Sequence, residues 1–381
     1  MVKVKVATSN VRGFLKDLFD YPHKKMKFVY KKQNVYNKSK KYKQMLYRVY
    51  RKFDQMIPFQ IIRTVQEGQD INFSFNRFLK SERPYVIYLE NPSALVNYSW
   101  RVLIKKKFAK RMRQCLSDKN LKGIVCMSNA CKNTVNMYYE IPKHIKIDCI
   151  YPLVSEDKEW NIDYVKNKAE QEKVECLFVS QFFRLKGGED IVETMIKLEE
   201  ENYPVHLTMI TNSKEISLEY QEKIRASNCI DIIEFGMSKE KLNEFYQQAA
   251  ILLHPTRGDS FALVVLEAMK YGCALIATDL YAIPEMIEDG KNGYLLNPYY
   301  RNWNRDNTPN FKVMEHHKET ILSGFVDEDI VNTMCEILKD LSTDRKKLRS
   351  LCMESYNKAL HGVFSEKYIA GAWENLMEEI S

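Results

Sequence analysis

The chain has 381 residues, too many for one ordinary hydrophobic core, so two domains are expected. Its 45% hydrophobic and 28% charged residues are typical of a water-soluble globular protein, and no apolar run reaches the roughly 18 residues that span a bilayer. Its nine cysteines include no CxxC pair, which favours reduced thiols in a cytoplasmic protein over disulfides or a zinc site. The first residues lack the apolar core of a secretion signal.

The net charge of +8 is distributed unevenly along the chain. Residues 1–150 hold 32 Lys and Arg against 10 Asp and Glu, whereas the remainder holds 26 against 40. Two stretches, 24–52 and 101–113, contain twelve and seven basic residues and no acidic one. This asymmetry predicts a polyanionic partner for the first half of the chain.

Short apolar runs in the first half predict buried parallel strands. Strand-like alternation opens the chain, and residues 84–90 and 123–128 are apolar runs bounded by turn residues. Residues 144–152 read as a further strand that leaves the first domain.

Apolar runs and helical patterns alternate regularly in the second half. Six expected strands, from "VECLFVS" to "GYLLNP", are separated by five expected helices. This alternation predicts a doubly wound parallel sheet. Residues 299–325 are a polar interruption without clear periodicity, and the chain returns to helix from Val326.

The stretch "HPTRGDSFALVVLEAM" joins the end of an expected strand to a helix and carries two carboxylates, Asp259 and Glu267. Ligands of open parallel sheets bind at the carboxyl ends of strands, where helix N-termini attract phosphate. Gly258, Ser260 and Ala262 are small enough for a ligand to approach the backbone. Burying the charge of a Glu in an apolar helix costs free energy unless the carboxylate has a binding partner. A carboxylate can accept hydrogen bonds from both hydroxyls of a ribose. A capping Asp and a solvated Glu are the alternatives.

A second loop, "FVSQFFRLKGGED", places Arg184 and Lys186 between a strand and a helix. Both cations suit a diphosphate at the neighbouring strand ends. Lys-Gly before a helix is also frequent where no ligand binds, so this pattern alone is weak.

Taken together, these motifs resemble the retaining glycosyltransferases of family 4, which have the GT-B fold. The match runs through "DSFALVVLEAMKYGCALIATDLYAIPEMIEDGKNGYLLNP", in which an acidic residue is followed by seven residues and Glu. It also includes "YIAGAWENLMEEI" near the end of the chain and covers roughly residues 120–298 and 326–381.

The resemblance implies an α/β chain of two Rossmann-like doubly wound domains facing a cleft. An acceptor-binding domain is expected at 1–152, and a domain that binds the nucleotide sugar is expected at 153–360. A final helix at 361–381 would cross back onto the first domain.

The resemblance also assigns roles to individual residues. Glu267 would hold the ribose hydroxyls, and Asp259 would face the transferred sugar. Lys186 and Arg184 would neutralise the leaving diphosphate. The backbone amides of Ser260, Phe261 and Ala262 would hold the diphosphate together with Lys186, and backbone near Phe235 and Met237 would line the base. Gly258 would let the ligand approach the loop.

Several positions depart from the family pattern. The family's first Glu is Asp259 here, one methylene shorter, and the Gly-Arg of its "GRLxxxKG" loop reads Ser180-Gln181. Arg184 is the candidate for that missing arginine, and the family's "GFG" reads Ser-Phe-Ala. On the acceptor side, many family members have a His after the strand that corresponds to "YVIYLENP", and this chain has no His there. The candidates here are Gly13, Glu90 and Asn91, whereas His254 reads as a structural histidine.

The expected activity is transfer of a sugar, with retention, from a UDP- or GDP-sugar to a lipid-linked or polymeric saccharide of the cell surface. No metal or other cofactor is expected, and the alternative is a non-catalytic binding protein on a degenerate GT-B scaffold. For the basic half we favour an anionic membrane surface on the cytoplasmic side. A diphosphate-lipid or polyanionic glycan acceptor and a solvated face without a partner remain alternatives, and no nucleic acid is expected.

Overall fold

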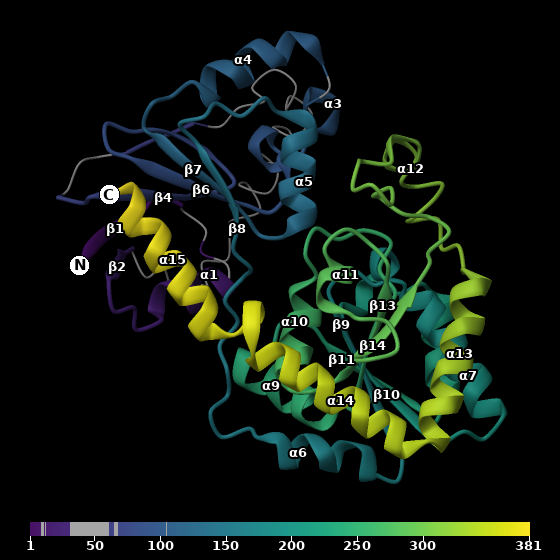
Figure 1. Ribbon diagram of the computed structural model, residues 1–381. Helices are drawn as coiled ribbons and strands as arrows, with labels where there is room; N and C mark the ends of the chain where they lie inside the picture. Colours follow the sequence, from purple (N-terminus) through teal and green to yellow (C-terminus); the bar gives the residue numbers. More distant parts are fainter. Residues whose placement is uncertain (9–10, 12, 31–60, 65–67, 104) are drawn as a thin grey trace. The chain divides into compact units, whose positions relative to one another are not determined.

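The structure, a computed structural model, describes residues 1–8, 11, 13–30, 61–64, 68–103 and 105–381 (Figure 1). The chain divides into two compact units, which we describe separately. Unit 1 comprises Met1–Ser155 and Ser365–Ser381, and unit 2 comprises Glu156–Phe364. The chain therefore leaves and re-enters unit 1 three to four residues after the boundaries expected from the sequence. Most of the basic stretch at 24–52 lies outside the described residues.

Unit 1 is built on a parallel sheet whose strands run in the order β2-β1-β4-β6-β7-β8. The central strands β4 and β6 are buried along their whole length, as continuous apolar runs predict. The bounds of the six strands are β1 (Val2–Val6), β2 (Met26–Val29), β4 (Ile71–Phe75), β6 (Tyr85–Leu89), β7 (Leu121–Cys126) and β8 (Lys146–Cys149). A separate parallel pair joins β3 (Ile61–Arg63) to β5 (Phe78–Lys80).

Helices from both ends of the chain complete unit 1. The last helix contributes Trp373, whose fully buried ring contacts the rings of Phe73 and Tyr88 at centroid distances of 5.5 and 5.1 Å. The helices of this unit are α1 (Gly13–Asp20), η1 (Pro92–Val96), α3 (Trp100–Leu103), α4 (Lys106–Leu116), α5 (Asn129–Tyr138) and α15 (Glu366–Ile380).

Unit 2 has a parallel sheet in the order β11-β10-β9-β12-β13-β14. Numbered in chain order, the strands lie in the sequence 3-2-1-4-5-6. The first three are added toward one edge of the sheet and the last three toward the other, so the strand order reverses between β9 and β12. The six strands expected from the sequence are confirmed as β9 (Val174–Ser180), β10 (Val205–Thr211), β11 (Ile230–Glu234), β12 (Ile251–His254), β13 (Ala274–Thr278) and β14 (Gly293–Leu296).

Helices of unit 2 form two packed groups: α13 lies along α7, and α14 lies along α10 and α6 (Figure 1). The longer helices are α7 (Gly188–Glu200), α8 (Leu218–Ala226), α9 (Lys239–Gln248), α10 (Leu263–Lys270), α13 (Glu328–Thr343) and α14 (Arg345–Leu360). The short ones are α6 (Ile162–Asn167), η2 (Lys168–Glu170), η3 (Arg184–Lys186), η4 (Ser213–Glu215), α11 (Ile283–Met286), α12 (Phe311–Glu315) and η5 (Gly362–Phe364).

Local sequence explains where many of these helices begin. A Ser or Asp side chain accepts a hydrogen bond from the backbone N–H three residues later, which satisfies one otherwise unpaired donor. The residues that cap helices in this way are Ser128, Ser217, Ser238, Asp327, Asp344 and Ser365. The polar interruption at 299–325 holds the short helix α12 and a series of turns. Among the described residues, no helix combines the length and the apolar character that crossing a membrane requires.

Candidate functional site

The sequence motifs meet at the point where the strand order in the sheet of unit 2 reverses, between β9 and β12. One loop follows β9 and contains η3 with Lys186, and the other follows β12 and runs through residues 255–262 to α10. Because β9 and β12 are adjacent parallel strands, both loops leave the same edge of the sheet. The fold thus brings the two motifs together although about 70 residues separate them.

Asp259 closes the turn that leads into α10. Its Oδ1 accepts hydrogen bonds from the backbone N–H groups of Ser260 at 2.8 Å, Phe261 at 3.3 Å and Ala262 at 3.0 Å. These are the amides that the resemblance assigns to a diphosphate. In this structure they bind a side-chain carboxylate, so an anion does occupy the N-terminal end of α10.

The other oxygen of Asp259 faces two cationic or polar side chains. Lys186 Nζ lies 2.5 Å from Oδ2 and also donates to the carbonyl oxygen of Gly258 at 2.9 Å. His254 Nε2 lies 3.3 Å from the same Oδ2. The cluster of Lys186, His254 and Asp259, which we call the Asp259 cluster, is therefore held by side-chain contacts from both loops.

Electrostatics keep Asp259 ionised. Burial would raise its pKa, but the Lys186 ammonium and the hydrogen bond with His254 outweigh burial and hold the pKa well below its usual range. For His254 the balance is reversed: burial lowers the pKa of the imidazole, although the Asp259 carboxylate opposes that effect. A neutral His254 can donate to Asp259 only from the tautomer that carries its hydrogen on Nε2.

An ion pair that the sequence analysis missed anchors the loop after β12. The Arg257 side chain is 1% exposed, and its Nη2 lies 2.8 and 2.6 Å from the two oxygens of Asp190. The same atom donates to the carbonyl oxygen of Phe325 at 2.7 Å. Burial raises the pKa of Asp190 to about 7 against the opposing effect of Arg257. The sequence did not predict this pair, because no periodicity or spacing links Asp190, which follows "KGGE", with Arg257, which precedes "GDS".

Gly258 has a different role from the one expected. A Cβ at this position would lie 2.2 Å from the Asn302 side-chain nitrogen, so the space next to the glycine is filled by protein. The neighbouring Trp303 donates from Nε1 to the carbonyl oxygen of Asp259 at 2.7 Å and stacks on Tyr281. The interruption at 299–325 therefore packs onto the loop, and Gly258 accommodates Asn302 where the sequence suggested a ligand.

Glu267 lies on the half-buried face of α10, together with Leu263 and Val264. Its carboxylate accepts a hydrogen bond at 3.0 Å from Tyr246, which is 1% exposed. The Tyr246 ring stacks on Tyr271 with a centroid distance of 5.9 Å. Glu267 therefore sits at the boundary between the core and solvent, where an immobilised hydroxyl from α9 orients it.

Other donor-side candidates lie in different surroundings. The Arg184 side chain lies against Glu189, with Nε 3.3 Å from Oε1, and donates to the Leu322 carbonyl oxygen at 3.4 Å. Phe235 is exposed and Met237 half-buried, on either side of Gly236, whose φ of +116° is one that residues with a Cβ rarely adopt. The Asp259 cluster thus includes Lys186 but no contact to Arg184 that would make it a substitute for the missing arginine.

The acceptor-side candidates all lie in unit 1. Gly13 begins α1, and outside its own helix and chain neighbours no described residue lies within 4 Å of the position that a Cβ would take there. Glu90 is buried, and its backbone N–H donates to the Asn76 side chain. Asn91 caps η1 by accepting from the backbone N–H of Ser93 at 3.0 Å.

The family match found by comparison with known proteins lies within unit 2. Residues 161–305 match the family model of the glycosyl transferases group 1. An "uncharacterized 41.2 kDa protein in cps region" of Klebsiella pneumoniae is 28% identical over an alignment of 229 positions that covers 54% of this chain and 60% of the relative. The N-acetyl-alpha-D-glucosaminyl L-malate synthase of Bacillus anthracis is 27% identical over 167 residues, 42% of this chain and 43% of the enzyme. Less than two thirds of either relative is matched.

Solved structures share the fold over more of the chain. Anabaena Alr3699/HepE in complex with UDP and glucose superposes with a TM-score of 0.60 and 12% identity, with 100% of both chains covered. The pneumococcal O-GlcNAc transferase GtfA in complex with UDP and GlcNAc gives a TM-score of 0.55 at 16% identity, over 87% of this chain and 59% of that one. With two parallel-sheet Rossmann-like units, these matches confirm the expected GT-B architecture.

Proposed function

Since the chain belongs to the glycosyl transferases group 1 family, we propose that it transfers a sugar from a UDP- or GDP-sugar to a lipid-linked or polymeric saccharide in cell-surface glycan synthesis. The relative from a cps region and the structural neighbours solved with UDP and a sugar support this proposal. Family membership supports the transferase activity itself.

The observation that carries the proposal is the Asp259 cluster at the reversal point of the sheet. Lys186 and the amides of Ser260 to Ala262 bind the carboxylate of Asp259 there, which supports the proposal that these groups can hold an anion. We propose that the donor diphosphate takes over these groups. Asp259 then exchanges its contact with Lys186 for hydroxyls of the transferred sugar.

The leaving nucleoside diphosphate gains negative charge as the glycosidic bond to the donor breaks. Lys186 and the N-terminal end of α10 offer fixed positive charge and dipoles at that position, which stabilise the transition state without later reorganisation. We propose that these groups take the place of a bound metal. The acceptor would attack from the face that the diphosphate leaves, and the anomeric configuration would be retained.

Glu267 is proposed to bind the ribose of the donor. A carboxylate accepts two hydrogen bonds, one to each hydroxyl of a vicinal diol, and the Tyr246 hydroxyl keeps it in one orientation. The exposed Phe235 and half-buried Met237 are proposed to lie beside the base.

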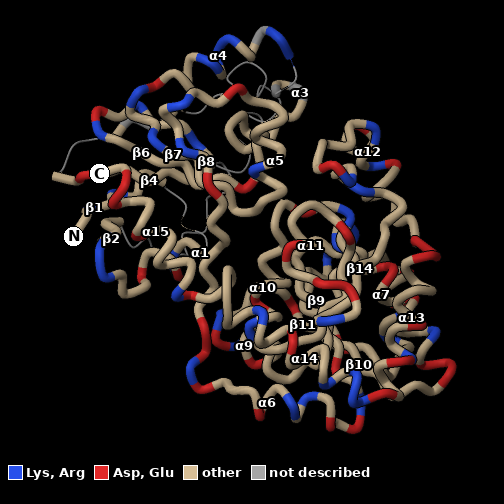
Figure 2. The backbone as a smooth tube through the Cα atoms, viewed as in Figure 1, with Lys and Arg blue, Asp and Glu red and all other residues tan. Residues whose placement is uncertain are grey.

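We further propose that the basic half of the chain docks on the cytoplasmic face of the membrane. The described part of this half includes residues 101–103 of α3 and residues 105–113, most of which lie in α4. Figure 2 shows Lys and Arg along α4. The docked protein would then meet a lipid-linked acceptor at the membrane surface.

The test is calorimetric binding and turnover with a panel of UDP- and GDP-sugars. Glu267→Ala should weaken binding of the productive donor at least about tenfold, since hydrogen bonds to a charged group contribute roughly 1.5–3 kcal/mol. Tyr246→Phe keeps the carboxylate and should weaken it less. Asp259→Asn should reduce turnover more than affinity. Unchanged affinity in Glu267→Ala would contradict the ribose assignment, and equal losses in Asp259→Asn would contradict its role at the sugar.

A second candidate function is binding without catalysis. It is favoured by one observation: Asp259 accepts five close contacts within the protein, so the loop before α10 is stabilised without a substrate. Release of nucleotide from a donor in the presence of acceptor extract separates the two. Tight nucleotide binding with no release for every donor would support the binding protein.

A further inference from the structure

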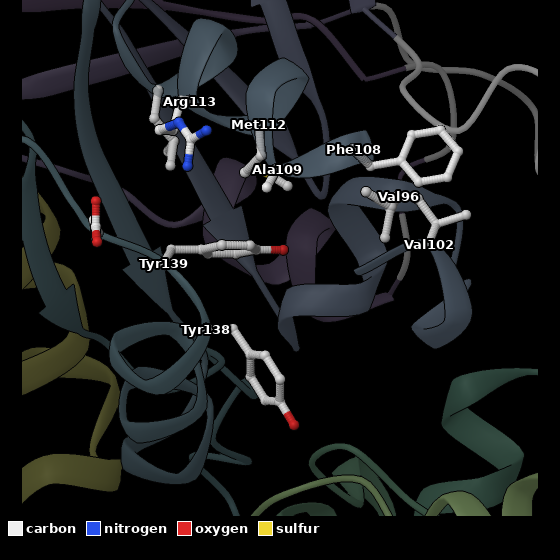
Figure 3. A pocket seen from close by; sticks show the side chains of 10 residues that line it. Val96, Val102, Phe108, Ala109, Met112, Arg113, Tyr138 and Tyr139 are labelled. Carbon is white, nitrogen blue, oxygen red and sulfur yellow. The ribbon is translucent and has the colours of Figure 1, made fainter. Parts of the chain in front are cut away.

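A pocket in unit 1 has no role in the donor chemistry described above. It holds about 150 Å³ and lies between η1, α3, α4 and the end of α5 (Figure 3). Its walls include the buried side chains of Val96, Val102, Met112, Leu116 and Tyr139. An enclosed cavity of about this volume holds a molecule the size of benzene. This pocket, which we call the α4 pocket, has buried apolar side chains in its wall and a polar rim, so it has room for about five or six carbon atoms at the end of a ligand that also carries polar groups.

The mouth of the α4 pocket is aromatic and charged. Tyr138 is half-buried and its ring contacts that of Trp100 edge to face at 6.1 Å. Figure 3 shows Tyr138 and Tyr139 across the pocket from Met112 and Ala109 of α4. Exposed Arg113 and Glu140 complete the lining. Tyr and Trp are the residues that prefer the boundary between hydrocarbon and water.

The helix beside the pocket divides its surface into two faces. Met112, Cys115 and Leu116 are buried, whereas Lys106, Lys110 and Arg113 are exposed at the i, i+4, i+7 spacing of one helical stripe. At 100° per residue, Ala109 and Arg113 fall on the border between these faces. The apolar pocket therefore opens directly beside a basic stripe.

We propose that the α4 pocket binds one hydrocarbon chain of an anionic membrane lipid, whose phosphate lies on the stripe of Lys106, Lys110 and Arg113. Apolar walls of this size match the end of a chain, an aromatic mouth matches the interface, and the basic stripe complements the phosphate. The single carboxylate of Glu140 at the mouth is outnumbered by the exposed cations of α4. The inference rests on the membrane docking proposed above and does not depend on sugar transfer.

The α4 pocket distinguishes this docking from attraction by charge alone. A purely electrostatic surface responds to salt and to the charge of the vesicle and is indifferent to the volume of a buried cavity. A chain-binding pocket also responds to a substitution that fills it while leaving the charge unchanged.

The experiment measures co-sedimentation with phosphatidylcholine vesicles that contain or lack phosphatidylglycerol. Ala109→Phe, which fills the pocket, and Lys106→Glu/Lys110→Glu, which reverses the stripe, should each weaken binding to the anionic vesicles at least about tenfold. Asn136→Phe on the exposed side of α5 and Lys16→Glu/Lys143→Glu, at exposed positions of the same unit outside the two basic stretches, are the matched controls, and they should bind nearly as the parent chain does.

Phosphatidylglycerol brominated on its acyl chains adds a readout for the chain itself. It should quench the fluorescence of Trp100, and the quenching should disappear in Ala109→Phe and in Trp100→Phe. Absent binding to anionic vesicles, or binding and quenching by Ala109→Phe equal to the parent, would overturn the proposal. Thermal unfolding verifies that each variant is folded, and donor binding by unit 2, which contains none of these substitutions, reports separately on the proposed sugar transfer.

Discussion

At the residue scale, Asp259 illustrates how one side chain can combine two tasks. Its Oδ1 closes the turn before α10, and its Oδ2 meets Lys186 and His254. A shorter acid than the family's Glu keeps the carboxylate close to its own backbone, where it binds the amides. This geometry makes Asp259 the internal counterion of a site that we propose for a diphosphate.

His254 predicts how stability depends on pH. Its pKa is lowered from 6.5 in the folded chain, chiefly by burial, so the unfolded chain binds this proton more readily. Its contribution to stability is therefore present above pH 6.5 and is lost as the pH falls below that value. His254→Gln, whose amide can still donate to Asp259, should lose less stability between about pH 7 and about pH 5 than the parent chain.

His206 provides the opposite control for that measurement. Its pKa is raised by the hydrogen bond to Glu175, so its contribution is present below pH 6.5 and is lost as the pH rises through the folded pKa. His206→Gln should make the loss of stability at acid pH larger. Chemical denaturation across this range checks both signs. An identical pH dependence for His254→Gln and the parent would show that His254 does not titrate as described.

At the scale of the element, α10 connects the site to the core. Its Ala262 end borders the Asp259 turn, Glu267 lies on its half-buried face, and its last residue, Lys270, is 3% exposed. Lys270 Nζ donates to the carbonyl oxygens of Ala359 and Phe364 and to Glu156. Because both ends are tied down, a displacement of the turn costs contacts along the whole helix.

Ala262 carries backbone strain that a substitution can release. Its φ of +64° is in the left-handed region, which costs a residue with a Cβ roughly 1–2 kcal/mol relative to glycine. Ala262→Gly removes this strain together with a buried methyl group. Ala282, equally buried at a φ of −85°, loses only the methyl group when replaced by glycine.

We therefore expect Ala262→Gly to be at least about 1 kcal/mol more stable than Ala282→Gly in denaturant unfolding. The comparison cancels most of the effect of the lost methyl group and of the greater freedom of glycine in the unfolded chain. Equal stability of the two variants would show that the turn relaxes at no cost.

At the scale of the whole molecule, the two ends of the chain belong to one unit. Unit 1 begins at Met1 and ends with α15, so unit 2 is inserted between its parts. The parts are joined by the buried Trp373 ring against Phe73 and Tyr88 and also by ion pairs such as Lys25 with Glu378. Folding of unit 1 therefore depends on residues about 300 positions apart in sequence.

Trp373→Ala should destabilise unit 1 by about 3–5 kcal/mol, because a large aromatic side chain leaves a cavity in a packed core. Tyr368→Ala, on the same helix at a position 54% exposed, should change stability much less. Intrinsic fluorescence and hydrogen exchange of β4 and β6 would monitor the effect. A loss for Trp373→Ala no greater than that for Tyr368→Ala would contradict the structural role of α15.

Much of unit 2 was readable from the sequence because its signals are local. Each buried parallel strand is a short apolar run, and each helix follows it with a 3.6-residue period and often a capping Ser or Asp. The six strands and the doubly wound class therefore followed from periodicity alone. The motif from Asp259 to Glu267 was also local, since one strand, one turn and one helix carry it.

Contacts between distant segments were decided only by the tertiary structure. The pairing of Lys186 with Asp259, the insertion of Asn302 beside Gly258 and the ion pair of Arg257 with Asp190 each join segments that no sequence period relates. Periodicity specifies which face of an element is buried, whereas the strand order decides which loops become neighbours. The sequence by itself thus determined the elements and the kinds of residue at the site, and the order of the sheet decided which of them meet.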